Sequence, residues 1–289
     1  MMPRNGGRVV AVCVGVLACG LIGAAVPANG QPGGELVATD APDAATIIER
    51  ALGVAERQRD AALDGRFEYV TAGTVESLDA QGNVTGTETT RRRHYLLEGH
   101  LYSELIARDG RPLDLDDARD ERERKAEFIR AARRHAARGE RYDPDEMHVE
   151  FDSGLMERYD TTVVGNDVVR GEQCWVIRFE PRAGRLPDDK RIDKALNRST
   201  GHLWITRHDY RVARVTFEMF RSFRWLWGIA GTLRHATGQF DLRWIQPNLW
   251  GLADSRIEFD VSVLFGMKSI RRRIRSEWIE HGPLDTAAP

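Results

Sequence analysis

The fold is decided by residues 238–281, which read GQFDLRWIQPNLWGLADSRIEFDVSVLFGMKSIRRRIRSEWIEH. In the middle of this stretch Ile257, Phe259 and Val261 alternate with Glu258 and Asp260. A period of two is typical of a β-strand with one buried face and one solvated face. Because short polar breaks separate three runs of this kind, the stretch predicts three long antiparallel strands joined by turns.

In the last of these runs, the large apolar residues lie on one face and most of the charged residues lie on the other. Ile270, Ile274 and Trp278 share one parity, whereas every second residue from Arg271 to Glu277 is charged. A helix would not separate the residues in this way. The three strands therefore present one large apolar face and one charged face.

Two helices and further strands are predicted upstream. Asp43 can cap the first helix, in which apolar residues recur at spacings of three and four from Ile47 to Ala62. The second helix extends from Asp114 to Arg138, with acidic residues in its first turn and arginines in its last, as the helix dipole favours. Its thin apolar stripe predicts a helix that lies on the surface or over the mouth of the sheet rather than inside the core. Residues 66–108 and 155–220 mostly alternate with period two and predict more strands.

The beginning of the chain predicts export. Arg4 and Arg8 precede an apolar run over residues 9–26, which ends at the small residues before Asn29. This is the pattern of a secretory signal peptide, and we place the cleavage after Ala28. A competing interpretation takes residues 16–19 as a bacterial lipobox, so that Cys19 is acylated and anchors a lipoprotein. The expected location is the periplasm or the outside of the cell.

The charge, cysteine count and length of the mature chain limit which disulfides, partners and domains it can have. After cleavage, Cys174 is the one cysteine left of three, so no disulfide can form within the chain. The formal net charge of −2 becomes −4 when Arg4 and Arg8 leave, which argues against a nucleic-acid partner. We expect residues 1–28 to be the signal peptide, 29–41 a flexible leader, 42–283 a single domain and 284–289 a disordered tail.

Common catalytic signatures are missing from the sequence. It has no Gly-x-Ser-x-Gly elbow, no His-Glu-x-x-His, no phosphate-binding glycine loop and no Cys-x-x-Cys pair. The eight histidines are scattered without metal-ligand spacing, and Cys174 is predicted to be a small packing residue. We therefore expect a non-enzymatic protein without a cofactor or metal, with an enzyme of unrecognised type as the remaining alternative.

Two pairs of strands carry a resemblance to a known family. Residues 168–181 read VVRGEQCWVIRFEP, and residues 201–215 read GHLWITRHDYRVARV. With the N-terminal helix and the helix-bearing insertion, these rhythms resemble the LolA/LolB type of half-barrel, which periplasmic lipoprotein carriers share with RseB-like regulators. The resemblance implies an α+β fold: a curved antiparallel half-barrel of about 9–11 strands, with the N-terminal and inserted helices covering the concave face.

The same resemblance implies that the concave face binds a lipid or the acyl chain of a lipoprotein. The alternative is an envelope sensor or scaffold whose cavity is filled by its own side chains and which binds a protein partner. The residues expected to line the cavity are Phe67, Tyr69, Trp175, Phe179, Val215, Phe217, Met219, Trp225, Trp227, Phe240, Trp244, Phe259 and Val263.

The apolar segment 223–230 has two interpretations. It carries Phe223, Trp225 and Trp227, and its remaining residues do not alternate regularly between apolar and polar. It is expected to be a loop that either plugs the core or contacts a ligand or, transiently, a membrane.

The N-terminus gives a first prediction. Because apolar residues continue well past Cys19, we expect cleavage after Ala28 and a mature protein without lipid. The intact mass of the exported protein measures this. A diacylglyceryl adduct on Cys19 would contradict it.

Overall fold

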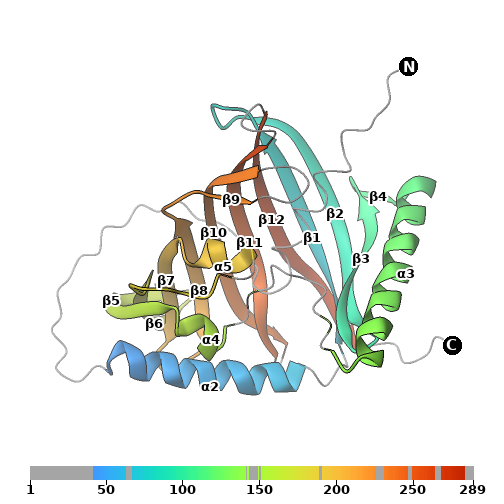
Figure 1. Ribbon diagram of the computed structural model, residues 1–289. Helices are drawn as coiled ribbons and strands as arrows, with labels where there is room; N and C mark the ends of the chain where they lie inside the picture. Colours follow the sequence, from blue (N-terminus) through green and yellow to red (C-terminus); the bar gives the residue numbers. More distant parts are fainter. Residues whose placement is uncertain are drawn as a thin grey trace.

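The protein is built on an open, curved, antiparallel sheet (Figure 1). The computed structural model describes residues 42–62, 67–140, 142, 149, 151–188, 191–225, 231–246, 249–263 and 268–283. Twelve strands form the sheet in the order β4-β3-β2-β1-β12-β11-β10-β8-β7-β6-β5, and β9 pairs with β10 beside this path. The predicted half-barrel is confirmed.

The helices are α2 (Ala44–Ala62), α3 (Leu115–Ala137), α4 (Ser153–Met156) and α5 (Arg191–Leu196). The strands are β1 (Phe67–Leu78), β2 (Val84–Leu97), β3 (His100–Arg108), β4 (Arg111–Pro112), β5 (Tyr159–Val169), β6 (Glu172–Pro181), β7 (Ser199–Thr206), β8 (Val212–Met219), β9 (Phe223–Trp225), β10 (Gly231–Gln246), β11 (Leu249–Val263) and β12 (Lys268–Pro283). The sheet exceeds the predicted range because it includes two short strands, β4 and β9, and β9 lies in a segment expected to be a loop.

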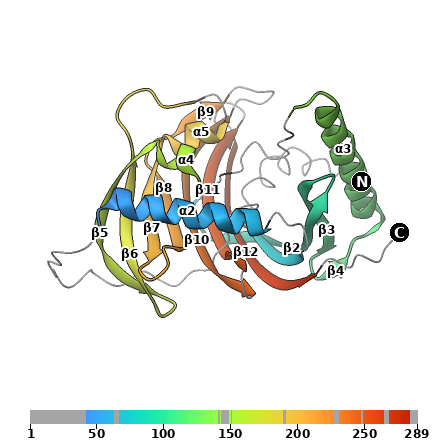
Figure 2. The same cartoon turned by 90° about the horizontal axis from the view of Figure 1, so that it is seen from below.

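Helix α2 covers part of the concave face, as predicted. It crosses the strands in Figure 2, and the Asp43 carboxylate caps it by accepting a 2.7 Å hydrogen bond from the Thr46 N–H. Ile47, Ile48 and Ala51 are buried against Trp175, Ile177 and other inward side chains of β5–β8. Within the described residues, no helix is both long and apolar enough to cross a membrane.

Helix α3 does not lie on the concave face, so that part of the prediction is wrong. Its Glu121 accepts a 2.7 Å hydrogen bond from the Tyr102 hydroxyl, and its Lys125 donates one of 3.1 Å to Glu104. Tyr102 pairs across the strands with Tyr95. These contacts place α3 beside the β2–β3 edge of the sheet (Figure 1).

The alternation of side chains along β2 shows on which face of the sheet α3 packs. His94, the neighbour of Tyr95, turns the other way, toward Thr71 and Tyr69 on the concave side. The two long helices therefore pack on opposite faces of one sheet. A thin apolar stripe suffices for α3 because its charged side chains bond the polar outer face.

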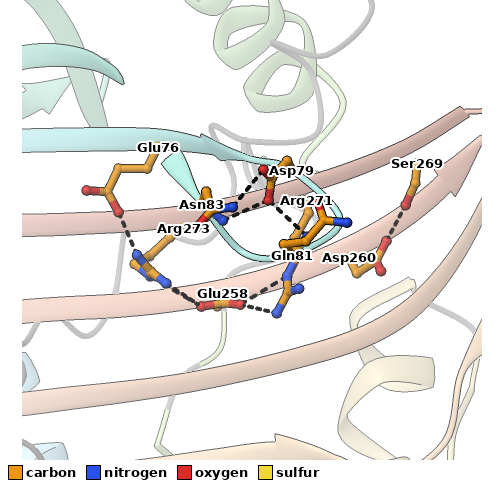
Figure 3. A network of polar contacts seen from close by, with 9 residues as sticks. All are labelled: Glu76, Asp79, Gln81, Asn83, Glu258, Asp260, Ser269, Arg271 and Arg273. Carbon is orange, nitrogen blue, oxygen red and sulfur yellow. Dashed lines mark hydrogen bonds and ion pairs between the residues drawn. The ribbon is translucent and has the colours of Figure 1, made fainter. Parts of the chain in front are cut away.

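The outward-pointing charged side chains of β12 form a ladder of ion pairs with neighbouring strands on the outer face (Figure 3). Glu258 on β11 accepts hydrogen bonds from Arg271 at 2.8 Å and Arg273 at 3.2 Å, and Arg273 reaches Glu76 on β1 at 3.0 Å. Partly exposed pairs of this kind each contribute at most about 1 kcal/mol. They keep the outer face polar and join three strands, while Ile257 and Ile274 are buried on the concave face.

A row of alternating phenylalanine and glycine crosses the middle of the sheet. Phe179, Gly201, Phe217 and Gly238 are successive partners on β6, β7, β8 and β10. A Cβ on Gly238 would collide with the Phe217 ring, and a Cβ on Gly201 would collide with the Thr216 carbonyl oxygen and the Phe179 ring. Each ring therefore occupies the space above the neighbouring glycine.

This row gives a prediction about stability. Gly201→Ala should lower the free energy of unfolding by about 1–3 kcal/mol, because the added methyl group meets backbone that cannot move aside. Gly165→Ala is the matched control, since a Cβ there has open space. Urea unfolding measures both variants. Equal stability of the two alanine variants would refute the packing argument.

Candidate functional site

The candidate site is the concave face, which has two parts. The first is the core cluster under α2, in which Trp175 and Phe179 are buried together with side chains of the helix. Ile47 is fully buried among them. The helix thus fills the space over these two predicted lining residues.

The second part is a cluster on β8, β10, β11 and β12. Met219, Phe240 and Phe259, all predicted to line a cavity, are buried here. Val215 and Phe217 are half-buried and join the two clusters. The buried side chains of α2 belong to the first cluster, although the helix also approaches β11.

Half-buried apolar side chains border the second cluster. Phe223, Leu233, Val261 and Val75 pack against it without being enclosed. They are absent from the lining expected from the sequence. For Val261 and Val75 the signal was available, since each shares the parity of a neighbouring inward residue.

One wall of the concave face is aromatic. Tyr69, a predicted lining residue, stacks on the His94 ring with centroids 4.4 Å apart and lies 4.2 Å from Trp278. The Thr71 hydroxyl and His94 Nε2 form a 2.9 Å hydrogen bond. His94 Nδ1 is buried and has no hydrogen-bond partner among the described residues. Burial, reinforced by the charge of Arg92, lowers the pKa of His94 to about 3.

The remaining predicted lining residues lie elsewhere. Trp244 is 45% exposed at the end of β10 and packs edge-on against Trp250, with the Arg211 guanidinium 4.1 Å from its ring centroid. Val263 is half-buried at the end of β11, between Gly231 and Lys268. The side chains of Phe67 and Trp225, and the whole of Trp227, lie outside the described residues.

The segment 223–230 is described only in part. Phe223–Trp225 pairs with β10 as strand β9, which corrects the expectation of a loop for these three residues. Backbone hydrogen bonds to β10 hold this segment as a strand, although its side chains do not alternate regularly between apolar and polar. Residues 226–230 are outside the described part, so the choice between plug and contact loop stays open.

Cys174 packs on the outer face. It is fully buried beside Val169 and Ala213, and burial raises the pKa of its thiol to about 11. Ala213 shares the parity of the inward Val215 and Phe217, but it turns outward because the register of β7 and β8 shifts between Trp204 and Ile205. The neutral thiol acts as a small packing group.

No family model matches the chain. No curated protein matches it either. Several solved structures are similar to it at low sequence identity. An outer membrane lipoprotein-sorting protein domain from Vibrio parahaemolyticus is 11% identical with a TM-score of 0.37, over 83% of this chain and 95% of that one.

Two further structures extend the list. A LolA superfamily protein from Nitrosomonas europaea is 11% identical with a TM-score of 0.29, over 86% of this chain and 96% of that one. MucB in the Pseudomonas aeruginosa MucA/MucB complex is 11% identical with a TM-score of 0.23, over 82% and 98%. All three scores lie below 0.5, so they carry no statement about function.

The buried His94 predicts a pH dependence of stability. Its pKa is about 3 in the folded protein and near the ordinary 6.5 when unfolded, so the unfolded state binds the proton first as pH falls. Stability should therefore decrease below about pH 6.5, by roughly 2 kcal/mol from this group between pH 7 and pH 5. His94→Gln should lack that part of the loss. Urea unfolding at the two pH values decides, and an equal loss in both proteins would contradict the assignment.

Proposed function

We propose that this chain is an exported, non-enzymatic binding protein that holds a lipid, or the acyl chain of a lipoprotein, against the concave face. The observation that carries the proposal is the apolar surface on β9, β10 and β11, which belongs to a core cluster that contains no side chain of α2. Phe223, Leu233 and Val261 are half-buried there.

An acyl chain suits this surface. Each methylene group that leaves water contributes about 0.8 kcal/mol, and the binding requires no directional partner. Leu233 on β10 and Val261 on β11 are direct partners, and Val261 is in turn the partner of Ile270 on β12, so apolar side chains adjoin one another across these strands. The Tyr69, His94 and Trp278 wall adds rings with polar atoms at the side of the stripe.

The scaffold or sensor alternative is supported by one observation. Trp175 and Phe179 are buried in one cluster with side chains of α2, so the protein itself fills this part of the concave face. In that case the concave face needs no ligand, and a protein partner in the envelope would bind the outer face or the loops. Native mass spectrometry of protein from a membrane-containing host separates the two functions, because co-purified lipid supports the first and a clean apo mass the second.

Val261→Asp tests the site itself. A carboxylate in the apolar stripe should weaken binding of a fluorescent fatty acid at least tenfold, since a charge must be buried beside the chain. Val164→Asp is the control, because Val164 is 49% exposed on the edge strand β5.

Circular dichroism melting curves show that each variant is folded before it is titrated. A folded Val261→Asp protein that binds the fatty acid as tightly as the unmodified protein would refute the proposed site.

A further inference from the structure

A cavity of about 480 Å³ lies on the face opposite α2, over β6, β7, β8, β10 and β11. Arg178, His202, Thr216, Gln239 and Arg256 line it and are successive partners across these five strands. They have the parity opposite to the buried Phe179 and Ile257, so they point away from the core. Most of the residues that line the cavity have polar or charged side chains.

Arg256 lies at one end of this row in an unusual electrostatic setting. Its direct partner on β12 is Arg275, so two like charges stand opposite each other, an arrangement that destabilises a sheet. Within the described part of the chain, no ion pair or hydrogen bond of the Arg256 side chain is found. Burial, together with the charges of Arg273 and Arg275, lowers the pKa of Arg256.

The neighbouring carboxylates are already used. Glu258 lines the cavity, but it accepts hydrogen bonds from Arg271 and Arg273 (Figure 3). The carboxylate of Glu76 lies 3.0 Å from the guanidinium of Arg273 and farther away, at 3.8 Å, from that of Arg275. Glu76 and Glu258 thus form ion pairs with three arginines, which are Arg271, Arg273 and Arg275. Among the described residues, neither glutamate is paired with Arg256.

Another cavity residue, Arg178, differs from Arg256. It is paired with Glu180 on its own strand. Glu218 lines the cavity from β8 and is exposed. Of the two arginines that line the cavity, Arg256 is therefore the one without an ion-pair partner among the described residues.

We propose that this outer cavity binds a phosphate group at Arg256. A guanidinium offers two parallel N–H donors to a phosphate, and a dianion can offset the charges of both Arg256 and Arg275, which a single carboxylate cannot. The hydroxyls of Thr216 and Thr237 line the same cavity and can donate further hydrogen bonds. The volume lies in the range of small-molecule sites.

The phosphate can belong to a free phosphate ester or to a lipid headgroup, and the two are distinguished by the probe. Inorganic phosphate, titrated by calorimetry at constant ionic strength, tests the free anion. Phosphatidylcholine vesicles with and without phosphatidic acid, in a sedimentation assay, test the headgroup. Binding to at least one phosphate probe is expected.

Arg256→Gln is the decisive variant. It should weaken binding of the phosphate probe at least tenfold, while its melting temperature stays equal to or above that of the unmodified protein, because a repulsion is removed. Arg243→Gln, which removes an equal charge from an exposed position on β10, is the control and should bind normally. Arg256→Lys keeps the charge and should bind more tightly than the glutamine variant.

Two results would overturn the proposal. One is the absence of binding to both phosphate probes by the unmodified protein. The other is a folded Arg256→Gln protein that binds as tightly as the Arg243→Gln control.

Discussion

The packing of phenylalanine rings over glycines in the row Phe179, Gly201, Phe217 and Gly238 is the constraint on which both faces of the sheet depend. On the concave side the two rings occupy the space above the glycines and join the core clusters through Phe217. On the other side the backbone of Gly201, Phe217 and Gly238 lies at the outer cavity. Larger side chains at the two glycines would displace the rings and, with them, the strands that carry Arg178, His202 and Arg256.

Local periodicity explains what the sequence could predict. The alternation in residues 238–281 placed Ile257 and Ile274 in the core and the arginines of β12 outside, because in a strand the parity of a residue determines its face. Helix α2 was predictable for the same kind of reason, since its apolar spacing and the Asp43 cap are properties of a single segment. The same holds for the start of α3, where Asp114 accepts the hydrogen bond from the Asp117 N–H.

Pairing between distant segments explains what the sequence could not predict. The face on which α3 packs depends on Tyr102 and Glu104 in β3 pointing outward, and the amphipathic pattern of the helix is compatible with either face. Ala213 turned outward because of one register shift. The opposition of Arg256 and Arg275 likewise follows from the register of β11 and β12, and a run of charges in one strand does not state which charge lies across from it. Several predicted lining residues became core for a related reason: α2 and neighbouring strands supply the side chains that fill the space above them.

The charged ladder also has a topological role. It ties β1 to β12, strands whose residues Glu76 and Arg273 are 197 positions apart, so this pairing closes a very long loop. Arg275 takes part in both settings, since it faces Arg256 on one side and approaches Glu76 on the other. A phosphate that offsets the charge of Arg275 would leave Glu76 to Arg273, which it already contacts at 3.0 Å. If the outer cavity holds a phosphate as proposed, its occupation would be linked to the β1–β12 pairing through Arg275. The aromatic wall of Tyr69 and Trp278 lies on the concave side of that same pair of strands.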